Sequence, residues 1–180
     1  MALRKALAYS KKKARPYTRN SRKKGKSYIK TIPFSKIVKF DSGVRKDYEQ
    51  GKFPYKISLE AEEGVQVRDN ALEACRMLLT KQMDENALGQ YFLMVKVHPH
   101  HFIRENKSAA AVAGADRIST GMTQSFGVVI GRAARVKPGQ ELFFISAATE
   151  KGAQAAKSAL NMIRSKVPCK SRVVFQKAGQ

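Results

Sequence analysis

The sequence predicts an α+β domain, in which an antiparallel or mixed sheet carries two helices on one side. Two stretches, starting near Asn70 and Thr149, show apolar residues at spacings of three and four, as helices do. The remaining apolar segments are short and end at Gly or Pro, as strands do. The amino-terminal segment is too polar to form a core. We therefore expect a basic arm over residues 1–34 and a single domain over residues 35–180.

Two strands are expected before the first helix. Residues 36–40 have strand composition and are followed by the stop signal Asp41-Ser42-Gly43. Residues 55–61 alternate apolar and polar side chains, so one face of that strand is buried and the other is wet.

The first helix is the clearest element of the sequence. Asn70 is expected to cap it, with Glu73 three residues later completing a capping box. The helix should end near residues 83–86. Its buried stripe is formed by Leu72, Cys75, Leu79 and Met83.

Strands and a loop should follow the first helix. Residues 90–97 are almost continuously apolar, which indicates a buried strand, and Pro99 ends it. Residues 102–104 form a second, short strand candidate. The small residues over 107–114 offer no large apolar anchor, so we expect a loop there.

The last third of the chain predicts a long strand over residues 126–136 that bends at its glycines. Lys137-Pro138-Gly139-Gln140 has type II turn chemistry, because Pro presets φ and Gly accepts a positive φ. Residues 142–145 form the return strand. The second helix follows from Thr149 to just before Pro168, and residues 172–175 form a final strand.

Positive charge is concentrated at the amino terminus. The first forty residues hold fourteen Lys or Arg and no carboxylate, whereas the whole chain has a net charge of +21. Tyr9, Tyr17 and Tyr28 lie among these cations. Phosphates neutralise such cations, and bases or riboses stack on such rings, so the composition favours a nucleic-acid partner.

Other classes of function find little support in the sequence. Cys75 and Cys169 are isolated, so we expect reduced thiols rather than a disulfide framework or a zinc site. His98-Pro99-His100-His101 lacks the further ligands that a metal needs, and its rings suit backbone or phosphate contacts better. No acid–base cluster or phosphate loop appears, and no apolar run approaches a membrane span. We expect no enzyme activity, metal, cofactor or membrane partner.

The candidate RNA-binding residues fall into two groups. The arm contributes Arg4, Lys5, Lys11, Lys12, Lys13, Arg15, Tyr17, Arg19, Arg22, Lys23, Lys24 and Lys26. The domain contributes Arg104, Lys107, Arg117, Arg132 and Arg135. Because Arg132 and Arg135 are three apart on one strand, they should face opposite sides unless a bulge at Gly131 intervenes.

Several short motifs, taken together, resemble a known family. They are Arg15-Pro16-Tyr17-Thr18-Arg19, Phe40-Asp41-Ser42-Gly43, Asn70-Ala71-Leu72-Glu73-Ala74, His98-Pro99, Arg104-Glu105-Asn106, Gly114-Ala115-Asp116-Arg117, Gly121-Met122, Phe126-Gly127 and Ala133-Ala134-Arg135-Val136. Over most of residues 15–150 their order is similar to that of the large-subunit ribosomal proteins called L-ten-e in archaea and eukaryotes and L-sixteen in bacteria. The chain departs from the family pattern at Thr123-Gln124 and Val128-Val129, where basic residues are common.

The resemblance implies a fold of the α/β-hammerhead type, embedded in large-subunit ribosomal RNA and in contact with neighbouring ribosomal proteins. It also implies a place beside the tRNA-binding cleft, with the loop over residues 105–117 pointing toward the tRNA sites. A structural role in translation, in cytoplasmic ribosomes, follows as the expected function. A chromatin or DNA-binding protein with a basic tail is the alternative, although the domain shows no recognition-helix pattern.

Overall fold

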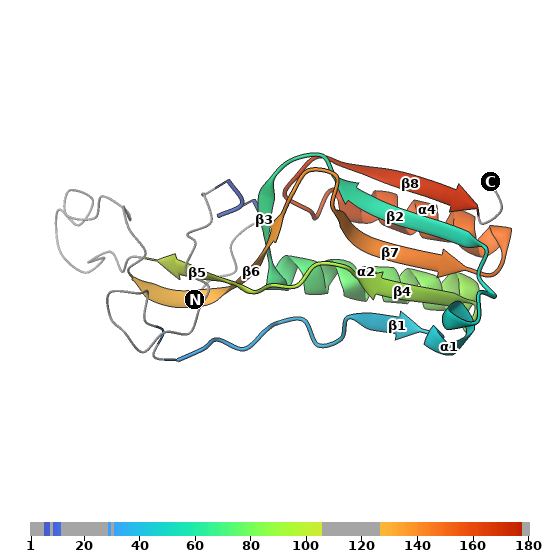
Figure 1. Ribbon diagram of the computed structural model, residues 1–180, viewed down its shortest axis with the longest axis horizontal. Coiled ribbons are helices and arrows are strands. Elements are labelled where there is room, and N and C mark those ends of the chain that lie inside the picture. The colour runs from blue at the N-terminus through green and yellow to red at the C-terminus, as the bar shows by residue number, and fades with distance from the viewer. Residues whose placement is uncertain (1–5, 8, 12–28, 30, 106–126, 178–180) are drawn as a thin grey trace.

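Eight strands form two antiparallel sheets in the computed structural model, which describes residues 6–7, 9–11, 29, 31–105 and 127–177. The larger sheet has five strands and forms one end of an elongated molecule, while the smaller sheet has three strands and extends from it (Figure 1). The α+β class predicted from the sequence is confirmed, and every strand pair in the described residues is antiparallel.

The five-stranded sheet has the order β1-β4-β7-β2-β8. Its strands are β1 (Asp41–Gly43), β4 (Tyr91–Val95), β7 (Glu141–Ala147), β2 (Tyr55–Ala61) and β8 (Ser171–Lys177). The predicted strands over residues 55–61, 90–97, 142–145 and 172–175 all fall in this sheet. Strand β7 lies at its centre because it pairs with both β4 and β2.

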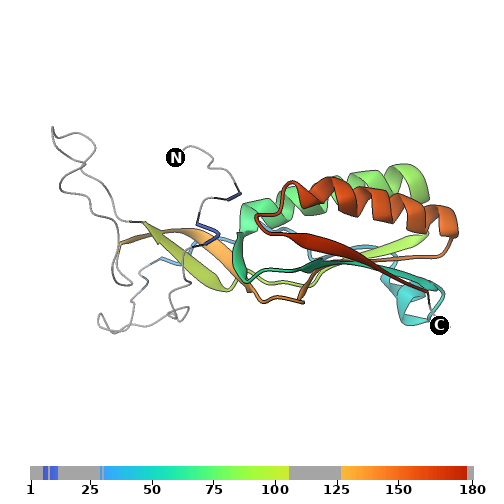
Figure 2. The same ribbon diagram turned by 90° about the horizontal axis from the view of Figure 1, so that it is seen from above.

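Two long helices, α2 (Asp69–Ala87) and α4 (Glu150–Arg164), cover one face of this sheet side by side (Figure 2). The prediction of two helices on one side is therefore confirmed. Burying their apolar stripes against the sheet supplies most of the core, since removing such side chains from water stabilises by roughly 25 cal/mol per Å². The helical residues with almost no exposure include Leu72, Cys75, Leu79, Met83, Leu160 and Ile163.

A smaller apolar cluster lies on the opposite face of the sheet. Because successive strand residues point to opposite faces, Phe92 and Phe144 leave the main core and join Phe53. The short helix α1 (Arg45–Glu49), which the sequence did not predict, covers this cluster with Tyr48. The rings of Tyr48 and Phe92 stack with centroids 4.8 Å apart.

The three-stranded sheet has the order β3-β6-β5, with β3 (Val65–Arg68), β6 (Val128–Val136) and β5 (His101–Glu105). Strand β6 continues into β7 through a turn in which the N–H of Gln140 donates to the carbonyl of Lys137 at 3.2 Å. Gly139 has a φ of +77° in this turn, as the predicted type II geometry requires.

Two local predictions are wrong at the start of the domain. Residues 36–40 form no strand, since the strand begins at Asp41. The capping box is also absent, because the α2 N-cap is Arg68 and no side chain caps it. The carboxylate of Glu73 instead bonds Arg76 and the N–H of Val38, at 2.6 and 3.4 Å.

A bulge, which the sequence left open as a possibility at Gly131, is present beside that residue but does not bring the two arginines of β6 together. The register between β5 and β6 shifts between Ile103 and Arg104, where Ile103 pairs with Gly131 and Arg104 with Val129. From Arg132 onward the ladder is regular, so Arg132 and Arg135 stay on opposite faces. The predicted loop over residues 107–114 lies outside the described residues.

Candidate nucleic-acid interface

A basic groove opens beside the three-stranded sheet. It is lined by residues 10–11, 64–66 and 135–140 and has a volume of about 850 Å³. Among the lining residues that the structure describes, Lys11, Arg135 and Lys137 are cations and none is acidic. We call these residues the basic groove throughout.

The groove joins the described end of the basic arm to the domain. Gln66 of β3 makes this junction, because its backbone N–H donates to the carbonyl of Ser10 at 3.2 Å and its side-chain amide donates to the carbonyl of Tyr9. Ser10 is almost fully buried, and its hydroxyl donates to the carbonyl of Leu7 at 2.8 Å. These bonds place Lys11 among the residues that line the groove, together with the cations of the domain.

The alternation of side chains along an extended chain determines which way the other two groove cations, Arg135 and Lys137, point. Arg135 and Lys137 are two residues apart along the extended chain, so their side chains project from the same face. Both are exposed.

His101 is buried on the neighbouring strand β5. Burial lowers the pKa of His101, and the positive charge of Arg135 lowers it further. The lowered pKa favours the neutral form of the imidazole.

Arg132 holds the segment over residues 31–40 against β6. Its Nε donates to the carbonyl of Pro33 at 2.8 Å, and its guanidinium lies 5.6 Å from the centre of the Phe102 ring. This segment presents unusual side chains to solvent. Phe34 is 92% exposed, and Val38 is also exposed, while Lys36 and Lys39 alternate with them. Exposed apolar groups gathered in one segment mark a surface that a partner covers.

Arg104 connects the strand ends on either side of residues 106–126. Its guanidinium donates to the carbonyl of Gly127 at 3.1 Å, which ties the end of β5 to the start of β6. Burial lowers the pKa of Arg104 from its ordinary value. An arginine that is partly withdrawn from water and bonded to the backbone acts first as a structural support for this junction.

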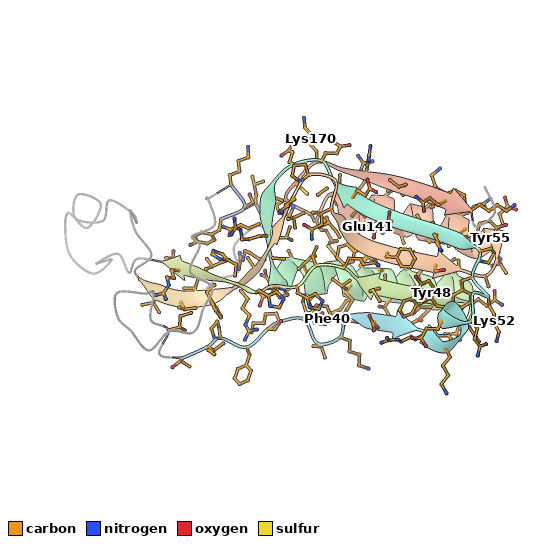
Figure 3. All side chains as sticks on the ribbon, in the orientation of Figure 1. Phe40, Tyr48, Lys52, Tyr55, Glu141 and Lys170 are labelled. Atoms are coloured by element: carbon orange, nitrogen blue, oxygen red, sulfur yellow. The ribbon has the colours of Figure 1, made fainter. Side chains whose placement is uncertain are left out.

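Three aromatic rings form a column on the surface, which we call the aromatic ladder. The rings of Phe40 and His98 are 4.2 Å apart and inclined by 24°, and those of His98 and His100 are 5.6 Å apart and inclined by 12°. Figure 3 places Phe40 beside β4, in the segment that leads into β1. The two histidines come from the connection between β4 and β5.

Four of the predicted RNA-binding residues are described by the structure: Lys11, Arg104, Arg132 and Arg135. Lys11 and Arg135 meet in the basic groove, whereas Arg104 and Arg132 make the separate backbone contacts given above. The remaining candidates lie outside the described residues: Arg4, Lys5, Lys12, Lys13, Arg15, Tyr17, Arg19, Arg22, Lys23, Lys24, Lys26, Lys107 and Arg117.

Lys137 is a member of the site that was not predicted from the sequence. A signal was present, because Lys137 follows Arg135 at the spacing of two that places strand residues on one face. The anchoring role of Gln66 had no such signal, since its partners Tyr9 and Ser10 are more than fifty residues away in the sequence.

Within the described residues, no three His, Cys, Asp or Glu side chains gather in a way that could hold a metal ion. None of the helices in those residues combines the length and hydrophobicity that a membrane span requires.

An α+β domain whose cations gather in a groove free of carboxylates has the surface chemistry of a nucleic-acid-binding protein. Comparison with known proteins makes the class more specific. A model of the family described as "Ribosomal protein L16p/L10e" matches residues 12–174.

Curated archaeal relatives align over almost the whole chain, and each is named large ribosomal subunit protein uL16. The protein of Staphylothermus marinus is 42% identical over 178 residues, which is 98% of this chain and 95% of the relative. That of Archaeoglobus fulgidus is 40% identical over 164 residues, covering 91% and 87% of the two chains. That of Methanococcus aeolicus is 38% identical over 182 residues, covering 100% and 98%. The chain therefore belongs to the L16p/L10e family of ribosomal proteins, a family of structural proteins and not of enzymes.

Proposed function

We propose that this chain is a structural constituent of the large ribosomal subunit that binds large-subunit ribosomal RNA near the tRNA-binding cleft. Membership of the L16p/L10e family supports the ribosomal role. In this proposal the chain works in cytoplasmic ribosomes, packs against neighbouring ribosomal proteins, and has the hammerhead-type fold of its family. The loop over residues 105–117 then points toward the tRNA sites.

The observation that carries the RNA-binding part of the proposal is the basic groove. Lys11, Arg135 and Lys137 line one open surface without a compensating carboxylate. Like charges gathered in this way repel one another until an anion neutralises them, so the groove favours a ligand with closely spaced negative charges. A ribose–phosphate backbone supplies such charges at regular intervals.

The groove also explains how the arm and the domain act together. Because Gln66 fixes the backbone of Tyr9 and Ser10 against β3, Lys11 of the basic arm lines the groove together with Arg135 and Lys137. A single RNA segment can therefore contact the domain and continue along the arm. Ribosomal RNA is recognised mainly through shape and phosphate contacts, which suits a site that is built from cations and backbone.

Sedimentation with a charge-matched pair of variants tests the proposal. The groove variant carries Lys11→Gln, Arg135→Gln and Lys137→Gln. The control variant carries Lys151→Gln, Lys157→Gln and Arg164→Gln, which removes the same charge from exposed positions of α4. Cell extracts that contain each variant are fractionated at low and at high salt.

We expect the wild type and the control variant to sediment with large subunits at both salt concentrations. The groove variant should be released from the subunits at high salt. Equal retention of the two variants would contradict an RNA-binding role for the groove. Sedimentation of the wild-type chain with chromatin would instead support the DNA-binding alternative.

A further inference from the structure

The aromatic ladder of Phe40, His98 and His100 is not explained by charge neutralisation. Its three rings are nearly parallel, and both intervals are compatible with stacking between aromatic side chains. The ladder is also distinct from the basic groove, since none of its residues lines that groove.

The backbone fixes one end of the ladder. The carbonyl of Phe40 accepts a hydrogen bond from the N–H of Val95 at 2.8 Å, which extends the pairing of β1 with β4 by one further contact. The Phe40 ring is only partly exposed and packs against the main core. The main core therefore covers the Phe40 end of the column.

A tight turn positions the other two residues of the ladder, His98 and His100. The N–H of His100 donates to the carbonyl of His98 at 3.0 Å, which closes a three-residue turn around the buried Pro99. The ring of proline restricts φ to the range that this turn uses, so the backbone positions of the two histidines are set before any ligand arrives. A ligand that stacks here does not have to order this turn, and this saves backbone conformational entropy.

Among the residues that the structure describes, His100 is the end of the column away from Phe40. Both His98 and His100 are exposed, and His100 has a stacking partner in the ladder on one side, His98. A flat aromatic ligand placed on the other side of His100 would continue the column. We propose that the aromatic ladder is a stacking platform for an unpaired nucleobase of RNA, an inference that rests on the RNA-binding function proposed above.

The positive charge of the chain favours a nucleobase, rather than an aromatic side chain of another protein, as the ligand of the ladder. The chain carries a net charge of +21, and the exposed Lys39 lies one residue from Phe40. A nucleotide brings a phosphate to such cations, whereas a phenylalanine or tyrosine brings no charge. The base has to be unpaired, because the faces of a paired base are covered by its neighbours in the helix.

The experiment compares two RNA probes, a short oligoadenylate strand and the same strand annealed to oligouridylate. The full chain and three variants are titrated with both probes at one salt concentration. His100→Ala removes the outer ring, His100→Phe keeps a ring without imidazole nitrogens, and Asn161→Ala is a control on the exposed face of α4. Because both probes contact the same cations, the ratio of their affinities isolates stacking from charge.

We expect His100→Ala to weaken binding of the single strand by about 5- to 150-fold, the range that removal of one stacked aromatic produces, and to leave duplex binding unchanged. His100→Phe should retain the preference for the single strand, as should Asn161→Ala. An unchanged ratio in His100→Ala overturns the platform, while the proposed function stands if the wild type binds both probes. Failure of the wild type to bind either probe overturns both proposals.

Discussion

The carboxylate of Asp69 accepts a hydrogen bond from the backbone N–H of Lys36 at 3.0 Å, across thirty-three positions of sequence. Asp69 is the first residue of α2 and is almost fully buried, and its other oxygen accepts from the N–H of Asn70 at 2.8 Å. One helical turn later, Glu73 accepts from the N–H of Val38. The start of α2 therefore holds the segment that carries the exposed Phe34 and Val38 and leads to the aromatic ladder.

Replacement of Asp69 by alanine should loosen this attachment. We expect Asp69→Ala to reduce the free energy of unfolding by about 1–3 kcal/mol, because two backbone N–H groups lose their partner. Urea denaturation measures the change. As a control, Asp47→Ala removes a more exposed ion pair with Lys52 and should cost about 0–1 kcal/mol. Equal losses of unfolding free energy in the two variants would show that the buried contacts of Asp69 stabilise the protein no more than an exposed ion pair does.

Glu73 should make stability depend on pH on the acid side. The hydrogen bond from Arg76 is the main reason why the pKa of Glu73 lies below its ordinary value of 4.5. A carboxylate with a lowered folded pKa stabilises the protein above its unfolded pKa, and this contribution is lost as the pH falls through the folded pKa. We expect Glu73→Gln to cost about 1 kcal/mol at neutral pH. The difference in unfolding free energy between Glu73→Gln and wild type should shrink as the pH falls below 4.5. A constant difference would contradict a stabilising role for the ionised Glu73 carboxylate.

Gly43 and Gly51 form a matched pair for testing the close approach of β1 to β4. Both have a positive φ, +87° and +74°. An added Cβ would lie 2.3 Å from the carbonyl oxygen of Tyr91 at Gly43, but would meet nothing within 4 Å at Gly51. Gly51→Ala should therefore cost only the left-handed strain of about 1–2 kcal/mol.

Gly43→Ala should cost about 2 kcal/mol more than Gly51→Ala, because β1 has to move away from β4. Thermal or urea unfolding of the two variants gives the comparison. If the two substitutions cost the same, the β1–β4 contact would not be as tight as the structure indicates.

The two cysteines should differ in reactivity. Cys75 is 1% exposed, and burial raises the pKa of its thiol to about 12. Cys169 is partly exposed, and burial together with the charges of Glu63 and Glu62 raises its pKa to about 11. We expect a thiol reagent to label Cys169 first and to reach Cys75 only when the protein unfolds, as mapped by mass spectrometry of the native chain. Equal labelling rates in the native state would contradict the burial of Cys75.

Periodicity predicted the long elements because it is a local property. Leu72, Leu79 and Met83 recur at helical spacing, and each is buried in the structure. The second helix also begins as predicted, since the hydroxyl of Thr149 accepts from the N–H of Gly152 at 3.2 Å. The turn at Gly139 was predictable because its chemistry lies within four residues.

The elements that the sequence did not predict depend on distant partners. Residues 36–40 have strand composition, but two of their backbone N–H groups donate to the carboxylates of Asp69 and Glu73. These bonds take the place of hydrogen bonds to a neighbouring strand. Strand β3 is only four residues long and α1 only five, too short for periodicity to distinguish from a loop.

The candidate site was only partly predictable for the same reason. Lys11 and Arg135 were recognised as cations, but their meeting depends on the bonds from Gln66 to Tyr9 and Ser10. The aromatic ladder joins Phe40 to His98, and this pairing exists only because β1 lies against β4. Charge predicted the class of ligand, whereas tertiary contacts determine where the charges and rings gather.

The salt dependence of binding to purified large-subunit ribosomal RNA tests most directly whether the basic groove neutralises phosphates. Each lost phosphate contact lowers the slope of log affinity against log salt by about 0.7–0.9. The Lys11, Arg135 and Lys137 groove variant should therefore have a slope smaller than that of wild type by about 2–3. The charge-matched variant of α4 should keep the wild-type slope. Equal slopes for the groove variant and wild type would contradict the account.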